Sequence, residues 1–391
     1  MKITSVKTIL LRWKCPVMGD ALTVCSARQA LLVKIETDTE LYGIGEAFGY
    51  GSPLNVGKAV IEEQLAPILV GEDPQNIEKL WQTMYWRTIA GGRRGVVMAA
   101  ISGIDIALWD LLGKALKTPV CKLLGCHSDR VPSYASGGFY APGKDLDGLR
   151  AELCRYRDRG YEATKIKMGR NPGMPLNAIR YMGNQEFGVT YEEDIRRLEL
   201  AREIMGEGQV GADLNAAWTA GQVLKAKDDF MRSRLDWLEE PVVFEDVEGC
   251  RRIVKELPQI SLMGFETEQG VKNFKRMIQD EMVDIVQPDI SWAGGISELV
   301  KIGSLAAAAD KPVSLHSFGS AVHFAASLHV AASLPNTVRM ESEENVNALK
   351  SQIITEPFEA DSHMNFYVPQ GPGLGISLDW EKLEEFAAYP A

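Results

Sequence analysis

From about residue 131 onward, short β-prone segments alternate regularly with helical segments. The β-prone segments span residues 131–136, 163–168, 209–214, 236–240, 260–266, 283–288, 312–316 and 337–341. From the third segment onward, the strand-end positions are 23 to 27 residues apart, at 213, 239, 266, 289, 316 and 341. One strand, one helix and two loops need such a length, so the spacing predicts an α/β fold of the TIM-type β/α barrel over residues 127–355. An open doubly wound sheet would show similar local texture, but eight regular units in succession favour closure.

Residues 1–126 show a different pattern, typical of an α+β domain. Three strands are expected at 2–11, 30–37 and 42–48, followed by helices at 55–69, 74–86 and 94–116. Apolar residues cover much of the circumference of the third helix, which predicts that it is well buried. The last segment, residues 356–391, lacks a further barrel unit, and we expect it to pack back on the first domain.

Charge and composition restrict the partners. A net charge of −11 argues against binding to the phosphate backbone of nucleic acids, which needs a basic surface. We expect no signal peptide and no membrane span, because the first residues alternate polar and apolar and no run of about 18 apolar residues occurs. The six cysteines form no CxxC pair, so neither a zinc cluster nor a disulfide framework is indicated. Reduced thiols and a cytoplasmic location are the expectation.

The predicted strand ends carry ionisable side chains, and in β/α barrels the chemistry sits at these ends. Taken singly, each has a structural explanation, such as a helix N-cap or a turn residue. Seven consecutive strands with such ends are improbable by chance, because Lys, Asp and Glu are rarely buried without partners. The candidate residues are Lys165, Lys167, Asp213, Glu239, Glu240, Glu266, Asp289, His316 and Glu341.

Three of these carboxylates end adjacent strands and should converge. Asp213, Glu239 and Glu266 would repel one another unless a cation neutralises them. Ligation by oxygen alone favours a hard ion, Mg²⁺ rather than Zn²⁺. The alternative is a set of salt bridges to Lys165 and Lys167. Periodicity alone does not decide whether Glu239 or its neighbour Glu240 faces inward.

The remaining candidates suit proton transfer. Lys165 and Lys167 are two residues apart on a strand and share one face, so each lowers the proton affinity of the other. A lysine with a lowered pKa is a usable base near neutral pH, although on a solvent-facing strand the pair would merely be solubilising. Asp289 beside His316 would fix the histidine tautomer and support its charged form. Glu341 could hydrogen-bond to a substrate.

The polar stretch at residues 169–190 is long for a loop inside a compact domain, and such loops are usually lids or binding loops. We expect it to close over substrate, with Arg170 and Arg180 as candidate carboxylate contacts. A surface excursion without function is the alternative.

With these strand-end residues, the chain resembles the enolase superfamily, mandelate racemase subgroup. The match covers nearly the whole chain in the right order. Its motifs are SGIDIALWDLLGK at 102–114, KIK at 165–167, ADLN at 212–215, WLEEP at 237–241, GFE at 264–266, QPD at 287–289, GG at 294–295, SLH at 314–316, RMES at 339–342 and GPGLGI at 371–376. The muconate-lactonizing subgroup has a lysine where Asp289 stands, so that branch is disfavoured.

The resemblance implies a modified barrel with an N-terminal capping domain that sets specificity through residues 14–26 and 49–53. It also implies one Mg²⁺, with Mn²⁺ as a substitute, and specific roles for the strand-end residues. Asp213, Glu239 and Glu266 would hold the metal, Lys167 and His316 would be bases on opposite faces of the substrate, and Lys165, Asp289, Glu341 and Asn215 would assist them or contact the substrate. The third metal motif departs from the usual GE, because a Phe intervenes in GFETE, so Glu268 is a possible substitute for Glu266.

The function implied is magnesium-dependent removal of the α-proton of a carboxylate through an enediolate, for which the superfamily is a known example. Dehydration of an acid sugar is the main expectation. Cycloisomerisation of a sugar lactone and racemisation or epimerisation are the alternatives, and a non-catalytic binding barrel is a remote one. The expected partner is a small carboxylate or its lactone, in a homo-oligomer. The glycines at 43–51 do not fit a dinucleotide fingerprint, and His323 and His329 are expected to be core residues.

Overall fold

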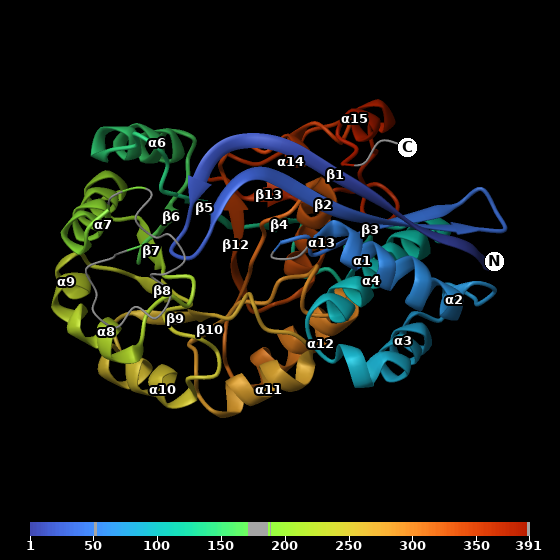
Figure 1. Cartoon of the computed structure of the whole chain (residues 1–391), viewed down its shortest axis with the longest axis horizontal. Helices are drawn as coiled ribbons and strands as arrows, with labels where there is room; N and C mark the ends of the chain where they lie inside the picture. The colour runs from blue at the N-terminus through green and yellow to red at the C-terminus, as the bar shows by residue number, and fades with distance from the viewer. Residues whose placement is uncertain (51–52, 171–186, 188, 389–391) are drawn as a thin grey trace.

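The computed structural model describes residues 1–50, 53–170, 187 and 189–388, and it has two parts, a cap and a barrel (Figure 1). The cap begins with an antiparallel sheet of three strands in the order β1 (Ile3–Gly19), β2 (Val24–Thr37) and β3 (Tyr42–Ala47). β1 and β2 form a long ribbon that arches toward the barrel, where Gly19 N donates to Tyr140 O.

The ribbon is longer than the sequence predicted, and residues 14–26 are mostly strand rather than loop. The register of the two strands shifts between Lys14 and Met18, which interrupts the alternation of polar and apolar residues. Pro16 lies in this irregular part, where the missing N–H of a proline is tolerated. Because the bulge breaks the alternation of polar and apolar residues, this alternation does not predict the second half of the ribbon.

Helices complete the cap. They are α1 (Leu54–Ala59), the π-helical η1 (Val60–Leu65), α2 (Ala66–Leu69), α3 (Ile77–Gly92) and α4 (Val96–Ala115). α4 is long and apolar enough to cross a membrane by length and composition alone, but 78% of its most apolar window is buried inside the protein. It is therefore the core helix of the cap, as its apolar circumference predicted.

The second part is a closed barrel, as predicted. Within the described residues eight parallel strands form it, and β12 pairs with β5 to close the ring. In chain order these strands are β5 (Ser133–Gly137), β6 (Ala163–Lys167), β7 (Gln209–Asp213), β8 (Trp237–Glu239), β9 (Ser261–Gly264), β10 (Ile285–Val286), β11 (Val313–Leu315) and β12 (Thr337–Glu343). The helices that follow them are α6 (Leu146–Asp158), α7 (Tyr191–Met205), α8 (Ala220–Lys225), α9 (Lys227–Arg232), α10 (Val247–Glu256), α11 (Val271–Gln279), α12 (Gly295–Ala308), α13 (Ala321–Ser333) and α14 (Ala348–Ser351).

The C-terminal stretch runs from the barrel back to the cap. β13 (Phe366–Tyr367) pairs with β4 (Arg130–Val131), which precedes the barrel, and α15 (Trp380–Glu385) lies beside the first cap strand. Arg12 N donates to Phe386 O in this region. The short helix α5 (Val120–Leu123) links the cap to the barrel.

Buried polar contacts join cap helix α4 to barrel helix α12. The carboxylate of Asp105 accepts hydrogen bonds from the backbone N–H of Ser297, at 2.9 Å, and from its hydroxyl, at 2.6 Å. Trp109 Nε1 donates to the same hydroxyl at 2.9 Å. Since unpaired buried polar groups are costly, these contacts favour one docked position of the cap.

The six cysteines, all among the described residues, are free, which agrees with the expectation from their spacing. The predicted lid falls largely on residues 171–186 and 188, outside the described residues, and so does Arg180. Arg170 is described, and its guanidinium donates to the backbone carbonyls of Asp20, at 2.5 Å, and Thr23, at 3.0 Å, in the turn of the ribbon.

Candidate active site

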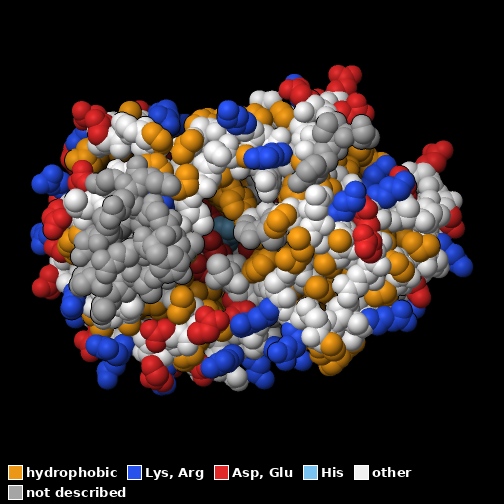
Figure 2. Space-filling view, in the orientation of Figure 1, with side chains coloured by type: hydrophobic (Ala, Val, Ile, Leu, Met, Phe, Trp, Pro, Cys, Tyr) orange, Lys and Arg blue, Asp and Glu red, His pale blue; other side chains and the backbone are white. Residues whose placement is uncertain are grey.

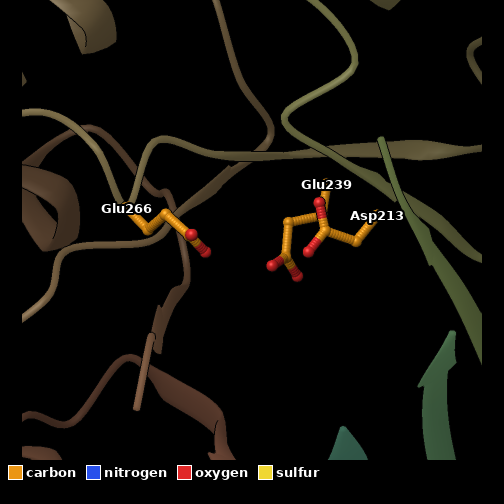
Figure 3. A group of neighbouring side chains, drawn as sticks. All are labelled: Asp213, Glu239 and Glu266. Carbon is orange, nitrogen blue, oxygen red and sulfur yellow. The ribbon is translucent and has the colours of Figure 1, made fainter. Parts of the chain in front are cut away.

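Three carboxylates converge at the carboxyl end of the barrel. In the parallel register Asp213 of β7 pairs with Glu239 of β8, so their side chains lie next to each other. Glu266, just beyond β9, points toward them from the opposite side (Figure 3). One oxygen from each residue can be chosen so that all three atoms lie within 4.8 Å of one another. The structure thus brings together the predicted metal ligands.

The neighbouring glutamates point elsewhere. The carboxylate of Glu240 accepts hydrogen bonds from the N–H of Thr267, at 3.2 Å, and its hydroxyl, at 2.7 Å. Glu268 forms an ion pair with Arg94 of the cap. The two ambiguities of the sequence therefore have a geometric answer, because Glu239 and Glu266 face Asp213 while their neighbours are bonded outside the group.

The group has the properties of a site for a hard divalent cation. Burial raises the pKa of Glu239 well above its usual value, against the opposing effect of Lys165, and raises the pKa of Glu266 to about 7, against that of His316. Glu239 Oε2 is buried with no hydrogen-bond partner among the described residues. An oxygen-only donor set with an unsatisfied buried oxygen fits Mg²⁺, which binds carboxylates and retains some water.

Salt bridges from the lysines, the alternative to a metal, are also present. Lys165 Nζ contacts Glu239 and lies 3.4 Å from Asp213 Oδ2, and Lys167 Nζ contacts the same Asp213 oxygen. These pairs leave Glu266 without a lysine partner within 4.0 Å in the described part of the chain. The lysines therefore compensate part of the negative charge, His316 Nε2 lies 3.1 Å from Glu266 Oε2, and the three convergent oxygens could in addition hold a metal ion.

The two lysines are buried and charged. Burial alone would lower their pKa values, but Glu239 and Glu341 raise that of Lys165 well above its usual value, and Asp213 raises that of Lys167. Conversely, the lysines outweigh the burial of Asp213 and lower its pKa to about 2. Protonation of Lys167 thus depends on Asp213, the residue that also faces the proposed metal position.

His316 and Asp289 lie across the barrel from the lysines: His316 follows β11, three strands from β6 in the order of the sheet, and Asp289 follows β10, four strands from it. His316 Nδ1 is 2.6 Å from Asp289 Oδ2, and its Nε2 is 3.1 Å from Glu266 Oε2. Burial would lower the pKa of His316, but Glu266 and Glu341, together with Asp289, raise it to about 10. Nε2 is therefore the nitrogen that faces the site.

Glu341 and Asn215 complete the predicted set. Glu341 lies between the two halves, with one oxygen 2.9 Å from Lys165 Nζ and the other 3.5 Å from His316 Nε2. Its pKa is lowered, because the positive charges of these two groups outweigh its burial. Asn215 donates from its backbone N–H to Asp213 Oδ1 at 2.8 Å. The contacts above thus connect Glu341 and Asn215 to the lysines, His316 and the three carboxylates. Figure 2 shows a hollow in this face of the molecule in which acidic and histidine side chains are visible.

Other residues at this mouth were not singled out from the sequence. Arg28 of the cap forms a buried ion pair with Glu343, donates to Tyr50 Oη at 2.7 Å and lies 3.9 Å above the ring of Phe318. The ring of Phe318 is 6.4 Å from that of His316. The sequence does not indicate that an arginine inside a strand contacts the barrel mouth, because this contact exists only once the cap is docked.

Comparison with known proteins agrees with this geometry. The family described as "Enolase C-terminal domain-like" matches residues 148–382, and the family "Mandelate racemase / muconate lactonizing enzyme, N-terminal domain" matches residues 3–125. The arabinonate dehydratase of Saccharolobus solfataricus is 34% identical over 92% of this chain and 90% of its own. The D-galactarolactone cycloisomerase of Agrobacterium fabrum is 33% identical over 99% of both chains.

A solved structure of a racemase from Streptomyces coelicolor with bound magnesium is also similar. It has a TM-score of 0.86 and 28% identity, over 99% of this chain and all of the other. Matched families at both ends, relatives over nearly the full length and a shared barrel with its cap lead to one conclusion. The chain belongs to the mandelate racemase-like branch of the enolase superfamily.

Proposed function

We propose that this protein removes the α-proton of an acid sugar and eliminates water from the resulting enediolate. The observation that carries this proposal is the placement of two buried basic groups, Lys167 and His316, on either side of three convergent carboxylates. The relatives that dehydrate or cycloisomerise sugar acids and lactones support the same chemistry.

The α-proton of a carboxylate is very weakly acidic, because its removal places a second negative charge on the same group. Asp213, Glu239 and Glu266 would hold Mg²⁺, which when bound supplies a Lewis acid that stabilises this charge. The Lys165 ammonium, buried beside Glu239 and Glu341, is placed to stabilise the same charge. Mn²⁺, which accepts similar oxygen ligands, is proposed as a substitute.

Lys167 and His316 divide the proton transfers. Lys165 lowers the proton affinity of Lys167, whereas Asp213 raises it. A cation held by Asp213 would offset the effect of Asp213, so that Lys167 could take the α-proton. His316, protonated and held by Asp289, then gives the Nε2 proton to the departing β-hydroxyl as the C–O bond breaks. Water leaves, and the enol that remains becomes a 2-keto acid by protonation at carbon. A substrate of opposite configuration would exchange the two roles.

Cycloisomerisation of a sugar lactone is the second candidate. It begins with the same proton removal, but a ring oxygen leaves in place of the hydroxyl. The specific observation in its favour is the match to the D-galactarolactone cycloisomerase, which extends over 99% of both chains. The cap, residues 1–126 with residues 356–391 against it, would select between such substrates.

Screening separates the two candidates. Mono- and di-acid sugars and their lactones would be incubated with the protein and Mg²⁺, and 2-keto acids measured as semicarbazones. We expect a 2-keto acid from at least one acid sugar. Consumption of a lactone without any keto acid would favour the cycloisomerase, and no reaction with either class would contradict the proposal.

Three further predictions accompany the function. Free thiols are consistent with the proposed cytoplasmic location. A homo-oligomer is expected, and sedimentation velocity would test it. The absence of nucleic-acid partners stays a prediction from the acidic charge, and the absence of membrane partners stays a prediction from the lack of a long apolar run.

A further inference from the structure

The third cap strand reaches into the barrel at the start of α13. Glu46, in the segment whose glycines do not fit a dinucleotide fingerprint, is 3% exposed. Its carboxylate accepts from the N–H of Ser320 at 3.0 Å, from the hydroxyl of Ser320 and from the N–H of His323 at 3.0 Å. A buried cap carboxylate thus fixes the first turn of α13.

That turn places His323 against the Asp289 carboxylate. His323 Nε2 is 3.6 Å from Asp289 Oδ2 and has no hydrogen-bond partner within reach in the described part of the chain. The same oxygen, Oδ2, is the partner of His316 Nδ1. His323, which the sequence indicated to be a core residue, is buried as expected, but its ring borders the histidine and aspartate of the site.

A second link, from the residue just after the same strand, reaches the other oxygen of Asp289. Phe48 N, two residues beyond Glu46, donates to the carbonyl of Ser291 at 3.1 Å. Ser291 in turn donates to Asp289 Oδ1 from its N–H, at 2.8 Å, and from its hydroxyl, at 2.7 Å. Both oxygens of Asp289 therefore contact residues that the cap strand holds.

The lysine half of the site has a different environment. The ion-pair partners of Lys165 and Lys167 in the described residues are Asp213, Glu239 and Glu341, which all lie on barrel strands. Lys167 Nζ also lies 5.1 Å from the centre of the ring of Phe139, another barrel residue. Among the described residues, the ion-pair partners of the two lysines thus lie in the barrel, whereas both oxygens of Asp289 contact residues that the cap holds.

We propose that Glu46 and His323 are positioning residues, through which the docked cap sets the orientation of the His316 ring. The inference rests on the proposed role of His316 in proton transfer. Neither residue touches the reacting atoms, and both act through Asp289. Because proton transfer requires close alignment, a displacement of about 1 Å at such a residue can cost roughly 10²-fold in rate.

The matched control for Glu46 is Asp105. Both are buried cap carboxylates that accept hydrogen bonds near the N-terminus of a barrel helix, α13 for Glu46 and α12 for Asp105. Asp105 bonds to Ser297 and, within the described part of the chain, forms no hydrogen bond or ion pair with Asp289 or His316. Loss of cap docking alone would therefore affect Glu46→Gln and Asp105→Asn alike.

The test is the side-chain ¹⁵N spectrum of histidine-labelled protein saturated with Mg²⁺ alone. The His316 signals are assigned by their loss in His316→Asn. In Glu46→Gln and in His323→Leu, we expect the His316 nitrogen signals to shift and the Nδ1 proton to exchange faster with water than in the wild type. Asp105→Asn should leave both unchanged, and urea midpoints verify that each variant is folded.

Two results would overturn the inference. One is an unchanged His316 spectrum in both Glu46→Gln and His323→Leu. The other is an equal change in Asp105→Asn, which would assign the effect to cap docking in general. Neither depends on turnover of an acid sugar, so a failure of the proposed function and a failure of this inference are separate outcomes.

Discussion

His316 Nδ1 lies 2.6 Å from Asp289 Oδ2, and this contact leaves Nε2 free to face the three convergent carboxylates. An aspartate so placed holds the proton on Nδ1 in the neutral ring and stabilises the ring when it is charged. Lys167, three strands away in the barrel, is instead paired with Asp213, which is also a proposed metal ligand. The two basic groups are thus prepared for different tasks.

This difference predicts separable functions for the two bases. With a substrate whose α-proton faces Lys167, His316→Asn should stop product formation, because the leaving hydroxyl then receives no proton. It should still allow deuterium from D₂O to enter the α-position through Lys167. Lys167→Ala should stop exchange as well, and each loss should be roughly 10²–10⁴-fold. Proton NMR of the recovered substrate measures the exchange.

The reverse pattern would exchange the roles of the two residues and keep the mechanism. His363→Asn is a suitable control, because this histidine is exposed and pairs with Glu162 far from the barrel mouth. Normal turnover and normal exchange in both His316→Asn and Lys167→Ala would refute the two-base proposal.

Metal binding should distinguish glutamates that are adjacent in the chain. We expect Glu239→Gln and Glu266→Gln to weaken Mg²⁺ binding at least tenfold, because each removes a charged ligand of a hard cation. Glu240→Gln and Glu268→Gln should bind Mg²⁺ nearly as well as the wild type, since these side chains bond to Thr267 and Arg94 instead. Titration calorimetry after treatment with a chelator measures the affinities.

Activity should follow the same division and should vanish after chelation. Full turnover by rigorously metal-free protein would contradict the metal proposal. Equal Mg²⁺ affinity in all four variants would contradict the assignment of ligands while leaving the fold untouched.

The strand-end residues could be predicted because two independent patterns coincide in the sequence. Strand spacing gives the positions, and ionisable residues such as Asp213 and His316 occur at them. A barrel then brings these ends together whatever the details of its loops. The contribution of Glu266 rather than Glu268 could not be derived in this way, because it depends on the backbone path after β9.

Contacts between the cap and the barrel could not be predicted from the sequence, for a physical reason. Glu46 reads as an ordinary strand residue and His323 as one histidine on an apolar helix. The contact of Glu46 with the first turn of α13 arises from docking of two parts that are more than 200 residues apart in the chain. The local periodicity of the sequence contains no information about such a contact. The full length of the β1–β2 ribbon could not be predicted for a local reason, which is the irregular register near Pro16.

Close packing of the cap predicts a sharp effect at one glycine. A Cβ atom on Gly45 would lie 2.0 Å from the carbonyl oxygen of Gly103 and 2.7 Å from Ala107 N, in the backbone of α4. Because backbone cannot move aside easily, Gly45→Ala should lower the free energy of unfolding by about 1–3 kcal/mol. Urea denaturation measures the change.

Gly91→Ala provides the comparison. This glycine lies in α3, and a Cβ there would meet nothing within 4 Å. Alanine is the better helix former, so the variant should gain about 0.5–1 kcal/mol. If both variants changed stability in the same direction, the close approach of β3 and α4 would not explain the requirement for Gly45.

A last prediction concerns the dependence of stability on pH. Burial lowers the pKa of His329 from its usual 6.5 to about 4. Between these values the unfolded chain binds a proton at His329 that the folded protein does not. The free energy of unfolding therefore falls as the pH falls through this window, and the contribution of the neutral ring is fully present above pH 6.5. A shift of this size corresponds to a loss of roughly 3 kcal/mol across the window.

The variant His329→Asn should remove this dependence. His329 Nδ1 accepts from the N–H of Cys121 at 3.1 Å, and the amide oxygen of asparagine can accept the same hydrogen bond without titrating. Urea denaturation of both proteins near pH 7 and again near pH 4.5 gives the comparison. The wild type should lose more stability than the variant between the two conditions, because only the wild type takes up this proton on unfolding. Parallel losses in the two proteins would mean that His329 does not contribute to acid sensitivity and that other buried groups account for it.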